Sequence, residues 1–487
     1  MNFFKGLAGQ TVIYGLGTIV PRVLNYLLLT PFYTRIFSQS QYGTVSELYA
    51  YSSLLLVLLI HGMETTYFRY SVDKNEEQSS FNHALFSTTL FASFFLVFTL
   101  LFKNAIAQVI GYQSNSNYII CFGFIIFFDV VTSIPFARLR NQNKALKFSI
   151  IKLVNIFVNI LLNIFFFVVC KDSNNNFFSS LYNPNINVGY AFISNMVSST
   201  ITFLLLLPEY KSFKFDISIQ KYIVMLNYAW PLIIIGISGM INEVSDKIFL
   251  KYFTDLSLNP LQQVGIYSAN YKLAVLMTIF IQMFNYAAEP FFFKKSASSD
   301  AKQSYSVVLN YFVIFCLIIF LVVTLYIDIF KFFIGSEFYS GLKIVPIILL
   351  ANMLLGIYYN LSVWYKINNL TFYGAVISLF GVFVTVLLNI ILIPKIGYMG
   401  SAFATFLCYF SMVIISYFWG QKVYPIAYNV KNIFVYSFVA IVLFIIRYTM
   451  SFNSFTLSIF VSSLFLLVFL FFVFCLEHKN LKRLICN

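Results

Sequence analysis

Charged residues are scarce in this chain. Asp, Glu, Lys and Arg make up 10% of its 487 residues, whereas hydrophobic residues make up 60% and the mean hydropathy is +0.84. Typical soluble domains carry about 25% charged residues. No water-soluble core could enclose so much apolar surface, so the composition excludes a soluble enzyme and predicts a protein that lies in a membrane.

Cysteine and histidine are also scarce, with six and three residues. The cysteines stand singly, without the paired spacing of a zinc site, a haem site or a disulfide framework. The nucleotide-binding motif GxxxxGKS/T is missing, as are HExxH and a nucleophile elbow. We therefore expect neither a cofactor nor bound ATP. The net charge of +14 does not indicate nucleic-acid binding, because the basic residues are spread over the loops.

The apolar residues come in runs of about 20, enough for a helix to cross a hydrocarbon layer about 30 Å thick. The runs lack the alternation that barrel strands require, so we predict an all-α membrane protein. About fourteen transmembrane helices are expected, over residues 11–37, 44–68, 84–102, 118–136, 148–170, 188–207, 222–250, 264–292, 305–326, 344–365, 372–393, 398–419, 433–448 and 455–476. No small-residue cleavage site follows the first run, which we interpret as a retained helix.

The basic residues also predict the topology. If the amino terminus is inside, the inside loops carry 19 Lys and Arg residues and the outside loops carry 8. The positive-inside rule therefore predicts that both termini lie in the cytoplasm. The loops are short, and the longest, 171–187, is rich in Asn and Ser without periodicity, so no soluble catalytic domain is expected.

The chain repeats itself in the same direction at an offset of about 222 to 227 residues. The matches include Gln41-Tyr42-Gly43 with Gln263-Val264-Gly265, Glu64 and Arg69 with Glu289 and Lys294, Asn163 with Asn389, and, at a shorter offset, Val188-Gly189-Tyr190 with Ile396-Gly397-Tyr398. Parallel repeats are a recurring transporter design in which the site lies between the two halves. We therefore predict a six-helix lobe over 1–210, a second over 211–420 and two additional C-terminal helices over 421–487.

Charged side chains at membrane depth are costly unless they face a cavity or a partner, so they indicate functional sites. They gather in two repeat-related pairs of helices, with Arg22, Glu47, His61 and Glu64 in the first pair and Glu243, Asp246, Lys247, Lys272 and Glu289 in the second. Asp129 and Lys152 lie in other spans.

Arg22 follows Pro21, which kinks a helix, and a kinked helix with a cation suits a gate. Alternatively, Arg22 reaches the membrane interface or neutralises Glu47. His61 is either a proton relay or a hydrogen-bonded packing residue. Near the expected cytoplasmic ends, Glu64 and Glu289 either act in a gate or pair with Arg69, Lys294 or Lys295.

Glu243 and Lys247 are four residues apart on one helix face and can pair. That pairing leaves Asp246 to bind a proton or a sodium ion. Lys247 and Lys272 can project into one cavity, where two cations would recognise an anion. Alternatively, Lys272 reaches water at the outer surface.

A set of short motifs recurs in a known family. The motifs are Tyr14-Gly15-Leu16-Gly17 with Pro21-Arg22, Gln41-Tyr42-Gly43, Gly62-Met63-Glu64-Thr65-Thr66-Tyr67-Phe68-Arg69, Ala137-Arg138-Leu139-Arg140 with Ala145-Leu146-Lys147-Phe148, and Leu161-Leu162-Asn163. Together they resemble bacterial O-antigen flippases, in the polysaccharide-transporter branch of the multidrug/oligosaccharidyl-lipid/polysaccharide exporter superfamily. The resemblance covers essentially the whole chain.

This resemblance implies a flippase that moves an undecaprenyl-diphosphate-linked oligosaccharide, an O-antigen, capsule or exopolysaccharide unit, to the periplasmic leaflet of the bacterial inner membrane. In a V-shaped cavity, the residues expected to contact the diphosphate are Arg22, Lys152, Lys247 and Lys272. The gating or cavity residues would be Glu47, His61, Glu64, Arg69, Glu289 and Lys294. The coupling ion would be a proton or sodium, with Glu243, Asp246 and Asn389 as candidates. We expect a monomer with a polysaccharide polymerase as a candidate partner.

Three other functions fit parts of the sequence. A drug exporter of the same superfamily would carry a carboxylate-rich cavity for organic cations, and a lipid II flippase would share the fold. A membrane polymerase or ligase of the same pathway would need a large outside loop with catalytic Arg or His. The outside loops expected here are short and hold no histidine, so we do not expect an enzyme.

Overall fold

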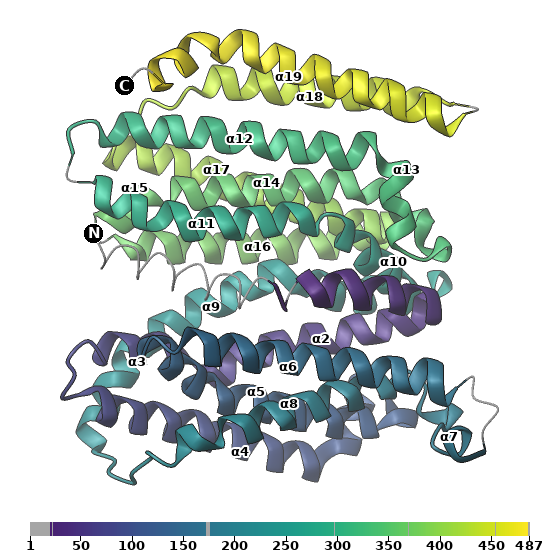
Figure 1. Cartoon of the computed structure of the whole chain (residues 1–487), viewed down its shortest axis with the longest axis vertical. Coiled ribbons are helices and arrows are strands. Elements are labelled where there is room, and N and C mark those ends of the chain that lie inside the picture. Colours follow the sequence, from purple (N-terminus) through teal and green to yellow (C-terminus); the bar gives the residue numbers. More distant parts are fainter. Residues whose placement is uncertain are drawn as a thin grey trace. The chain divides into compact units, whose positions relative to one another are not determined.

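The computed structural model describes residues 20–21, 23–171, 176–296, 298–368, 370–452 and 454–485. Helices dominate these residues, which form no β-strand (Figure 1). Contacts within the chain divide it after Tyr252 into two compact units. The predicted lobe boundaries at residues 210 and 420 stay a prediction.

In the first unit, residues 23–36 are helical. They are followed by α2 (Gln39–Ile60), α3 (Met63–Tyr70), α4 (Glu77–Val109), α5 (Asn117–Asn141), α6 (Ala145–Ile164), α7 (Asn176–Ser180), α8 (Gly189–Tyr210) and α9 (Ile219–Phe253), with short segments η1 (Gln113–Asn115), η2 (Phe165–Cys170) and η3 (Pro184–Ile186). The α9 helix packs through Met225 and Ala229 against Met63 and Tyr67 of α3 and Phe81 of α4.

The second unit begins with η4 (Leu256–Leu258) and α10 (Pro260–Leu273). It continues with α11 (Val275–Lys295), α12 (Ala301–Leu325), α13 (Ile327–Phe330), η5 (Lys331–Phe333), η6 (Ser336–Ile344), α14 (Val345–Leu361), α15 (Val363–Ile367), α16 (Thr371–Ile396), α17 (Tyr398–Val423), α18 (Val430–Thr449) and α19 (Phe455–Ile485).

The predicted membrane helices are confirmed over the described residues. Twelve helices there are long and apolar enough to cross a membrane, or thirteen if α10 and α11, which meet at 52°, form one span. These correspond to thirteen of the expected helices. The remaining one, 11–37, lies partly outside the described residues.

Three helices that the sequence predicts as continuous are broken. His61 and Gly62 separate α2 from α3 because both have positive φ angles, 37° and 73°. Ala274 separates α10 from α11, and Ser362 separates α14 from α15. The breaks were not predicted because hydropathy stays high across each of them. The 171–187 loop, whose sequence shows no periodicity, contains the short segments α7 and η3.

Each unit repeats one packing pattern. In the first, α8 packs against α5 and α6; in the second, α17 packs against α14 and α16. At the beginning of these helices, Asn187 (φ 50°, ψ −123°) and Gly397 (φ 55°, ψ −136°) share an unusual backbone conformation. Asn tolerates a positive φ better than most residues. Asn187 and Gly397 therefore share a backbone conformation, while the sequence match of Gly189 with Gly397 stays a prediction.

The repeated Gln contacts the same place in each unit. Gln41 donates from Nε2 to Oδ1 of Asn187 at 2.9 Å, and Oε1 of Gln263 accepts from the Tyr398 backbone N–H at 3.3 Å. The two glutamines thus hold the beginning of α8 and of α17. These matched contacts support the predicted internal repeat.

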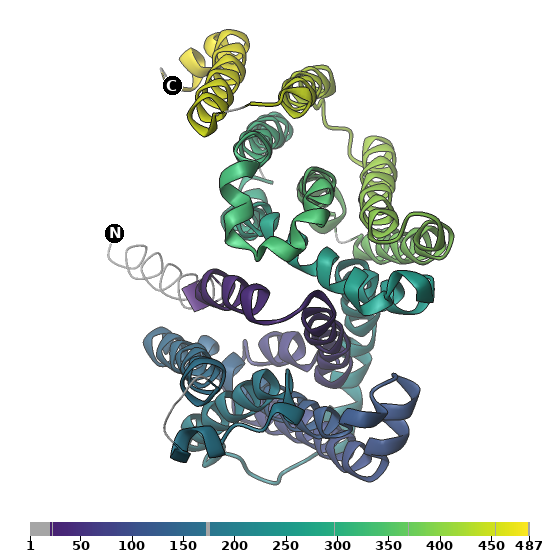
Figure 2. The ribbon, with the colours of Figure 1, turned by 90° about the vertical axis from the view of Figure 1, so that its right-hand side faces the viewer.

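The two last helices pack against each other and against α12 (Figure 2). Polar groups hold them there: Glu477 of α19 accepts from Asn310 of α12 at 2.8 Å and from Tyr436 of α18 at 2.6 Å, and Ser462 donates to the Leu325 carbonyl at 2.8 Å. Apolar burial adds little between helices in lipid, so such hydrogen bonds contribute to their association.

Candidate functional site

A buried carboxylate lies near the beginning of α2. This helix begins with a capping box, in which Ser38 and Gln41 each accept a hydrogen bond from the backbone N–H of the other. Glu47 follows about two turns later, and its side chain is fully buried. Nζ of Lys251 on α9 donates to Oε1 of Glu47 at 2.8 Å, and the Tyr112 hydroxyl donates to Oε2 at 2.5 Å.

The cation of this pair is also well surrounded. Lys251 Nζ donates to the Ile110 carbonyl at 2.5 Å and lies 4.1 Å from the centre of the Tyr112 ring. Burial, reinforced by the Glu47 carboxylate, raises the pKa of Tyr112, so this hydroxyl stays protonated and can donate. The cluster fastens α9 to α2 and to the connection after α4, at the end predicted to face the periplasm.

Glu47 has a different partner from the one considered from sequence. The sequence offered Arg22, which lies outside the described residues, and assigned Lys251 to an outside loop. In the structure Lys251 lies in the last turn of α9. A second contact at this end joins the same two helices, because the Tyr51 hydroxyl donates to the Tyr252 hydroxyl at 3.0 Å.

At the opposite end of the first unit, the two longest motifs of the family resemblance contact each other. Glu64 of α3 forms an ion pair with Arg140 of α5, and Asn141 donates to the Tyr67 hydroxyl at 3.3 Å. Arg69, a predicted partner of Glu64, is exposed in the last turn of α3. Glu64 thus pairs with Arg140, a cation from the other motif that the prediction did not name, and its role in a gate stays a prediction.

A buried arginine extends this network. Arg138 is 6% exposed and donates from Nε to Glu77 at 3.2 Å and from Nη2 to Gln78 at 2.7 Å, while its guanidinium lies 4.1 Å from the Phe81 ring centre. Tyr67 donates to the same Glu77 carboxylate at 2.8 Å. The end of α5 is therefore held against α3 and α4.

The second unit contains the repeat-related ion pair. Glu289 of α11 accepts from Lys366 of α15 at 2.8 Å, as Glu64 does from Arg140 in the first unit. The expected partner Lys294 is exposed at the end of α11. Glu64, in the first turn of α3, and Glu289, near the end of α11, thus each pair with a cation near the end of another helix of the same unit. Neither cation is one that the prediction named.

His61 lies at the break between α2 and α3. Its Nδ1 is 2.6 Å from the Leu59 carbonyl and its Nε2 is 2.7 Å from the Ser87 hydroxyl. The ring also makes an edge contact with Phe91. This is the hydrogen-bonded packing role that the sequence left open, and both ring nitrogens are occupied.

The repeat-related asparagines are both fully buried. Asn163 accepts from the Tyr33 hydroxyl at 2.8 Å, and Asn389 accepts from Ser401 at 3.0 Å while donating to the Thr385 carbonyl at 2.7 Å. Asn389 therefore joins α16 to α17. Its oxygen is occupied by this hydrogen bond, and its proposed role as an ion ligand stays a prediction.

The predicted substrate cations that the structure describes lie on three different helices. Lys152 of α6 lies over the Phe136 ring at 4.1 Å. Lys247 is half-buried on α9 of the first unit, and Lys272 is half-buried in the last turn of α10 of the second, next to the bend at Ala274. Arg22 lies outside the described residues. A shared cavity for these cations stays a prediction.

The predicted ion-coupling carboxylates lie on α9. Glu243 is exposed, whereas Asp246 is buried and accepts from the Lys247 backbone N–H at 3.0 Å. Over the part of the chain that the structure describes, no three His, Cys, Asp or Glu side chains gather closely enough to hold a metal ion. A single coupling proton or sodium ion stays a prediction.

The profile of the family described as polysaccharide biosynthesis protein matches residues 7–296, more than half of the chain. The chain belongs to this family. The resemblance to polysaccharide transporters inferred from the motifs is thereby confirmed. A search among curated proteins gives no match.

Solved structures show which fold this family member has. The chain is similar to the lipid II flippase MurJ in an inward closed conformation, with a TM-score of 0.71 at 16% identity over 96% of this chain and 100% of that one. It is also similar to an inward-facing multidrug resistance MATE transporter of the MOP superfamily, with a TM-score of 0.59 at 12% identity over 85% of this chain and 94% of that one. A third similar structure is MATE in complex with MaD3S, with a TM-score of 0.60 at 12% identity over 86% of this chain and 95% of that one. The protein is a multi-pass membrane protein with a fold like that of MurJ and MATE transporters.

Several residues of this family member were missed from sequence. Lys251 was treated only as a loop charge that reports topology, and Arg138 and Arg140 were recognised in a motif of the resemblance but given no partner or role. Their partners lie 204, 61 and 76 residues away, and nothing in a single sequence connects such positions. The repeat offset of the sequence was the one available signal, because it matches Asn141 with Asn368 at the ends of two helices. Arg140, the partner of Glu64, comes one residue before Asn141, and Lys366, the partner of Glu289, comes two residues before Asn368.

Proposed function

We propose that this protein is a flippase that moves an undecaprenyl-diphosphate-linked oligosaccharide from the cytoplasmic to the periplasmic leaflet of the bacterial inner membrane. The observation that carries the proposal is the combination of the polysaccharide biosynthesis family with the fold of MurJ and MATE transporters. The family supplies the class of substrate, and the fold supplies a means of moving it across a bilayer.

The chemistry of the substrate fits the charges of the chain. A diphosphate cannot cross hydrocarbon unaided, and cations in a water-filled cavity stabilise it. Arg22, Lys152, Lys247 and Lys272 lie within the predicted spans and are not counted with the loops. We assign them to the diphosphate, with the lipid tail remaining in the bilayer.

The ion pairs give each unit the rigidity that rocking requires. Alternating access by rocking moves two halves as bodies around a fixed site. Glu47 with Lys251 and Glu64 with Arg140 fasten the two ends of the first unit, and Glu289 with Lys366 fastens the second. In our proposal these contacts persist through the cycle while the cavity opens to one leaflet at a time.

In this proposal a proton or sodium gradient drives the cycle. Asp246 is the first candidate for the residue that binds the coupling ion, and Glu243 and Asn389 are the other candidates. The protein works as a monomer with both termini in the cytoplasm, catalyses no covalent reaction and delivers its product to a polysaccharide polymerase. No bound cofactor takes part.

Reconstitution tests the proposal directly. The purified chain is placed in vesicles that contain a fluorescent undecaprenyl-diphosphate-linked oligosaccharide, and a reductant that cannot cross the membrane bleaches the outer leaflet. We expect the protein to expose the inner pool to bleaching, and Lys272→Ala or Arg22→Ala to slow this at least tenfold. Lys395→Ala, an exposed lysine at the end of α16, is the matched control and should flip at the wild-type rate.

The alternatives give different results in the same assay. A drug exporter would accumulate an organic cation in the vesicles and leave the labelled lipid in place. A lipid II flippase would move lipid II in preference to the oligosaccharide lipid. An enzyme of the pathway would change the mass of the labelled lipid. If the wild-type protein bleaches no more lipid than empty vesicles do, the proposed function is wrong.

A further inference from the structure

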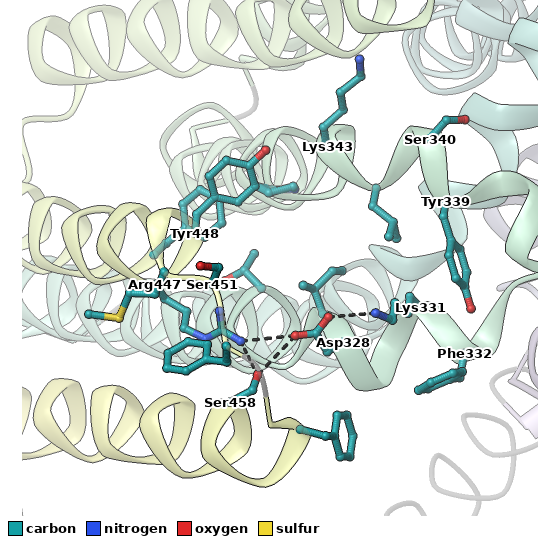
Figure 3. A pocket seen from close by; sticks show the side chains of 18 of the residues that line it. Asp328, Lys331, Phe332, Tyr339, Ser340, Lys343, Arg447, Tyr448, Ser451 and Ser458 are labelled. Carbon is teal, nitrogen blue, oxygen red and sulfur yellow. Dashed lines mark hydrogen bonds and ion pairs between the residues drawn. The ribbon is translucent and has the colours of Figure 1, made fainter.

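The second unit contains a charged pocket that the proposed transport cycle does not use. It has a volume of about 650 Å³ and lies between the end of α12, the segments α13 and η6, the end of α18 and the beginning of α19 (Figure 3). Every one of these elements lies in the same unit. By the predicted topology, these ends face the periplasm.

Three cations and one carboxylate line this pocket, which gives it a net charge of +2. Asp328 of α13 is shared between Lys331 at 2.9 Å and Arg447 at 3.3 Å (Figure 3). Arg447 is 8% exposed and donates further to Ser458 at 2.5 Å and to Ser462 at 3.0 Å. The carboxylate is therefore already neutralised and would not repel an anion.

The third cation lies apart from that network. Lys343 of η6 stands on the opposite side of the pocket from Asp328 in Figure 3, where its side chain points away from Asp328 and its ammonium group lies 5.4 Å from the centre of the Tyr398 ring. Ser340, Ser451 and Ser454 also line the space. Two positive charges in excess and several neutral donors are what a phosphate group requires.

The walls of the pocket are of the kind found at a membrane interface. Tyr448 is 70% exposed and Phe455 is 53% exposed, and they stand where α18 ends and α19 begins. Aromatic residues gather at the level of the lipid headgroups, and basic pockets between spanning helices bind such groups. Below the pocket, α18 and α19 expose large apolar side chains such as Ile445 and Phe460, along which acyl chains can lie.

We propose that this pocket binds the phosphate of an anionic phospholipid of the outer leaflet, with its headgroup between Lys343 and Arg447 and its acyl chains along α18 and α19. The lipid would join η6 and α12 to the two additional helices. The volume suits a glycerophosphate headgroup, since pockets for small molecules measure about 300 to 1,000 Å³. A free phosphate would leave the aromatic walls and the apolar helix surface without a ligand.

Native mass spectrometry of the full chain in detergent tests this proposal. The protein is incubated with phosphatidylglycerol or with phosphatidylcholine, and bound lipid is counted after mild activation. We expect phosphatidylglycerol to be retained at least fivefold more than phosphatidylcholine. Lys343→Gln should remove most of that preference, and Lys331→Gln together with Lys343→Gln should abolish it.

A control variant and a second experiment distinguish a specific lipid site from non-specific attraction of anionic lipid to the positively charged protein. Lys395→Gln removes the same charge from the same predicted face and should retain the wild-type preference. Equal retention of the two lipids, or an equal loss in Lys395→Gln, would overturn the proposal. In the second arm, 10 mM inorganic phosphate replaces lipid. A rise in thermal stability there that depends on Lys343 would assign the site to free phosphate and also overturn it. Each variant is first checked for wild-type elution as a single species.

Discussion

At the scale of single residues, the buried charges determine where the first unit is most sensitive. Glu47 is fully buried, and its charge is balanced by one cation, Lys251, with Tyr112 as a further donor. Removing one partner of a buried ion pair leaves an uncompensated charge, which costs about 3 to 5 kcal/mol, whereas replacing both with apolar groups of similar volume is often neutral.

We therefore expect Lys251→Met to destabilise the protein by about 3 kcal/mol and Glu47→Gln with Lys251→Met to recover most of that loss. Thermal unfolding of the purified protein in detergent, followed as a double-mutant cycle, measures both. Lys395→Met, in which an exposed lysine is lost, should unfold like the wild type. A double variant that is no more stable than Lys251→Met would mean that the two side chains act separately.

Asp328 offers a test of pH dependence outside the membrane-spanning segments. Burial alone raises its pKa, but the Lys331 and Ser458 hydrogen bonds and the Lys331 and Arg447 charges together lower it below the usual value. A group with a lowered pKa in the folded state stabilises the fold above its unfolded pKa, about 3.9 for Asp, and loses that contribution as the pH falls further.

Asp328→Asn should therefore lower the unfolding temperature at pH 7, and the difference from wild type should shrink as the pH falls below about 4. The carboxylate is 37% exposed, so the effect is modest, roughly 0.5 to 1 kcal/mol after solvent screening. Unfolding in detergent between pH 7 and pH 3 measures it. A difference that stays constant over this range would show that the ion pairs of Asp328 do not stabilise the fold.

At the scale of elements, the break between α2 and α3 depends on one glycine. Gly62 has a φ of 73°, and a Cβ added there would lie 3.1 Å from the Ala229 carbonyl oxygen of α9. A side chain at this position is strained by its backbone conformation and by this contact, each at a cost of order 1 kcal/mol. The glycine thus allows α9 to pass close to the break.

We expect Gly62→Ala to destabilise the first unit by about 1 to 3 kcal/mol. Gly239→Ala is the matched control, because Gly239 lies inside α9 and an added Cβ meets nothing within 4 Å. That control should be neutral or more stable by up to about 1 kcal/mol, since Ala favours helix. Unfolding of both variants in detergent gives the comparison. If both behave alike, the break tolerates a side chain.

The elements also show what sequence reasoning can reach. The apolar runs predicted the spans of α4, α5 and α16 because hydropathy reports membrane crossing directly. They could not predict the breaks at His61 and Ala274, where the backbone changes direction without a change in composition. Glu47 was recognised as a buried charge by its cost in lipid, but its partner Lys251 was not, because a partner is set by packing between distant helices.

At the scale of the whole molecule, the internal repeat explains why the two units share equivalent contacts. It does not extend to the ion pair of Glu47, which is found in the first unit. Gln41 and Gln263 hold equivalent helix beginnings, and Glu64 and Glu289 form equivalent ion pairs. Glu47 has no counterpart, because its repeat position at the same offset is Ala269. The ion pair with Lys251 is therefore specific to the first unit, and symmetry alone could not have predicted it.

The same asymmetry bears on ion coupling, the last part of the proposed cycle. Asp246 is a buried carboxylate on α9, and a carboxylate at membrane depth can bind a proton or a sodium ion. We expect Asp246→Asn to remove the dependence of flipping on an imposed proton or sodium gradient while leaving slow flipping down the lipid gradient. The two rates are measured in vesicles with and without each gradient.

Glu243→Gln changes an exposed carboxylate on the same helix and serves as the control. This variant should keep more of the dependence of flipping on the gradient. Flipping that is equally fast with both gradients collapsed in the wild-type protein would show that transport is not coupled to either ion.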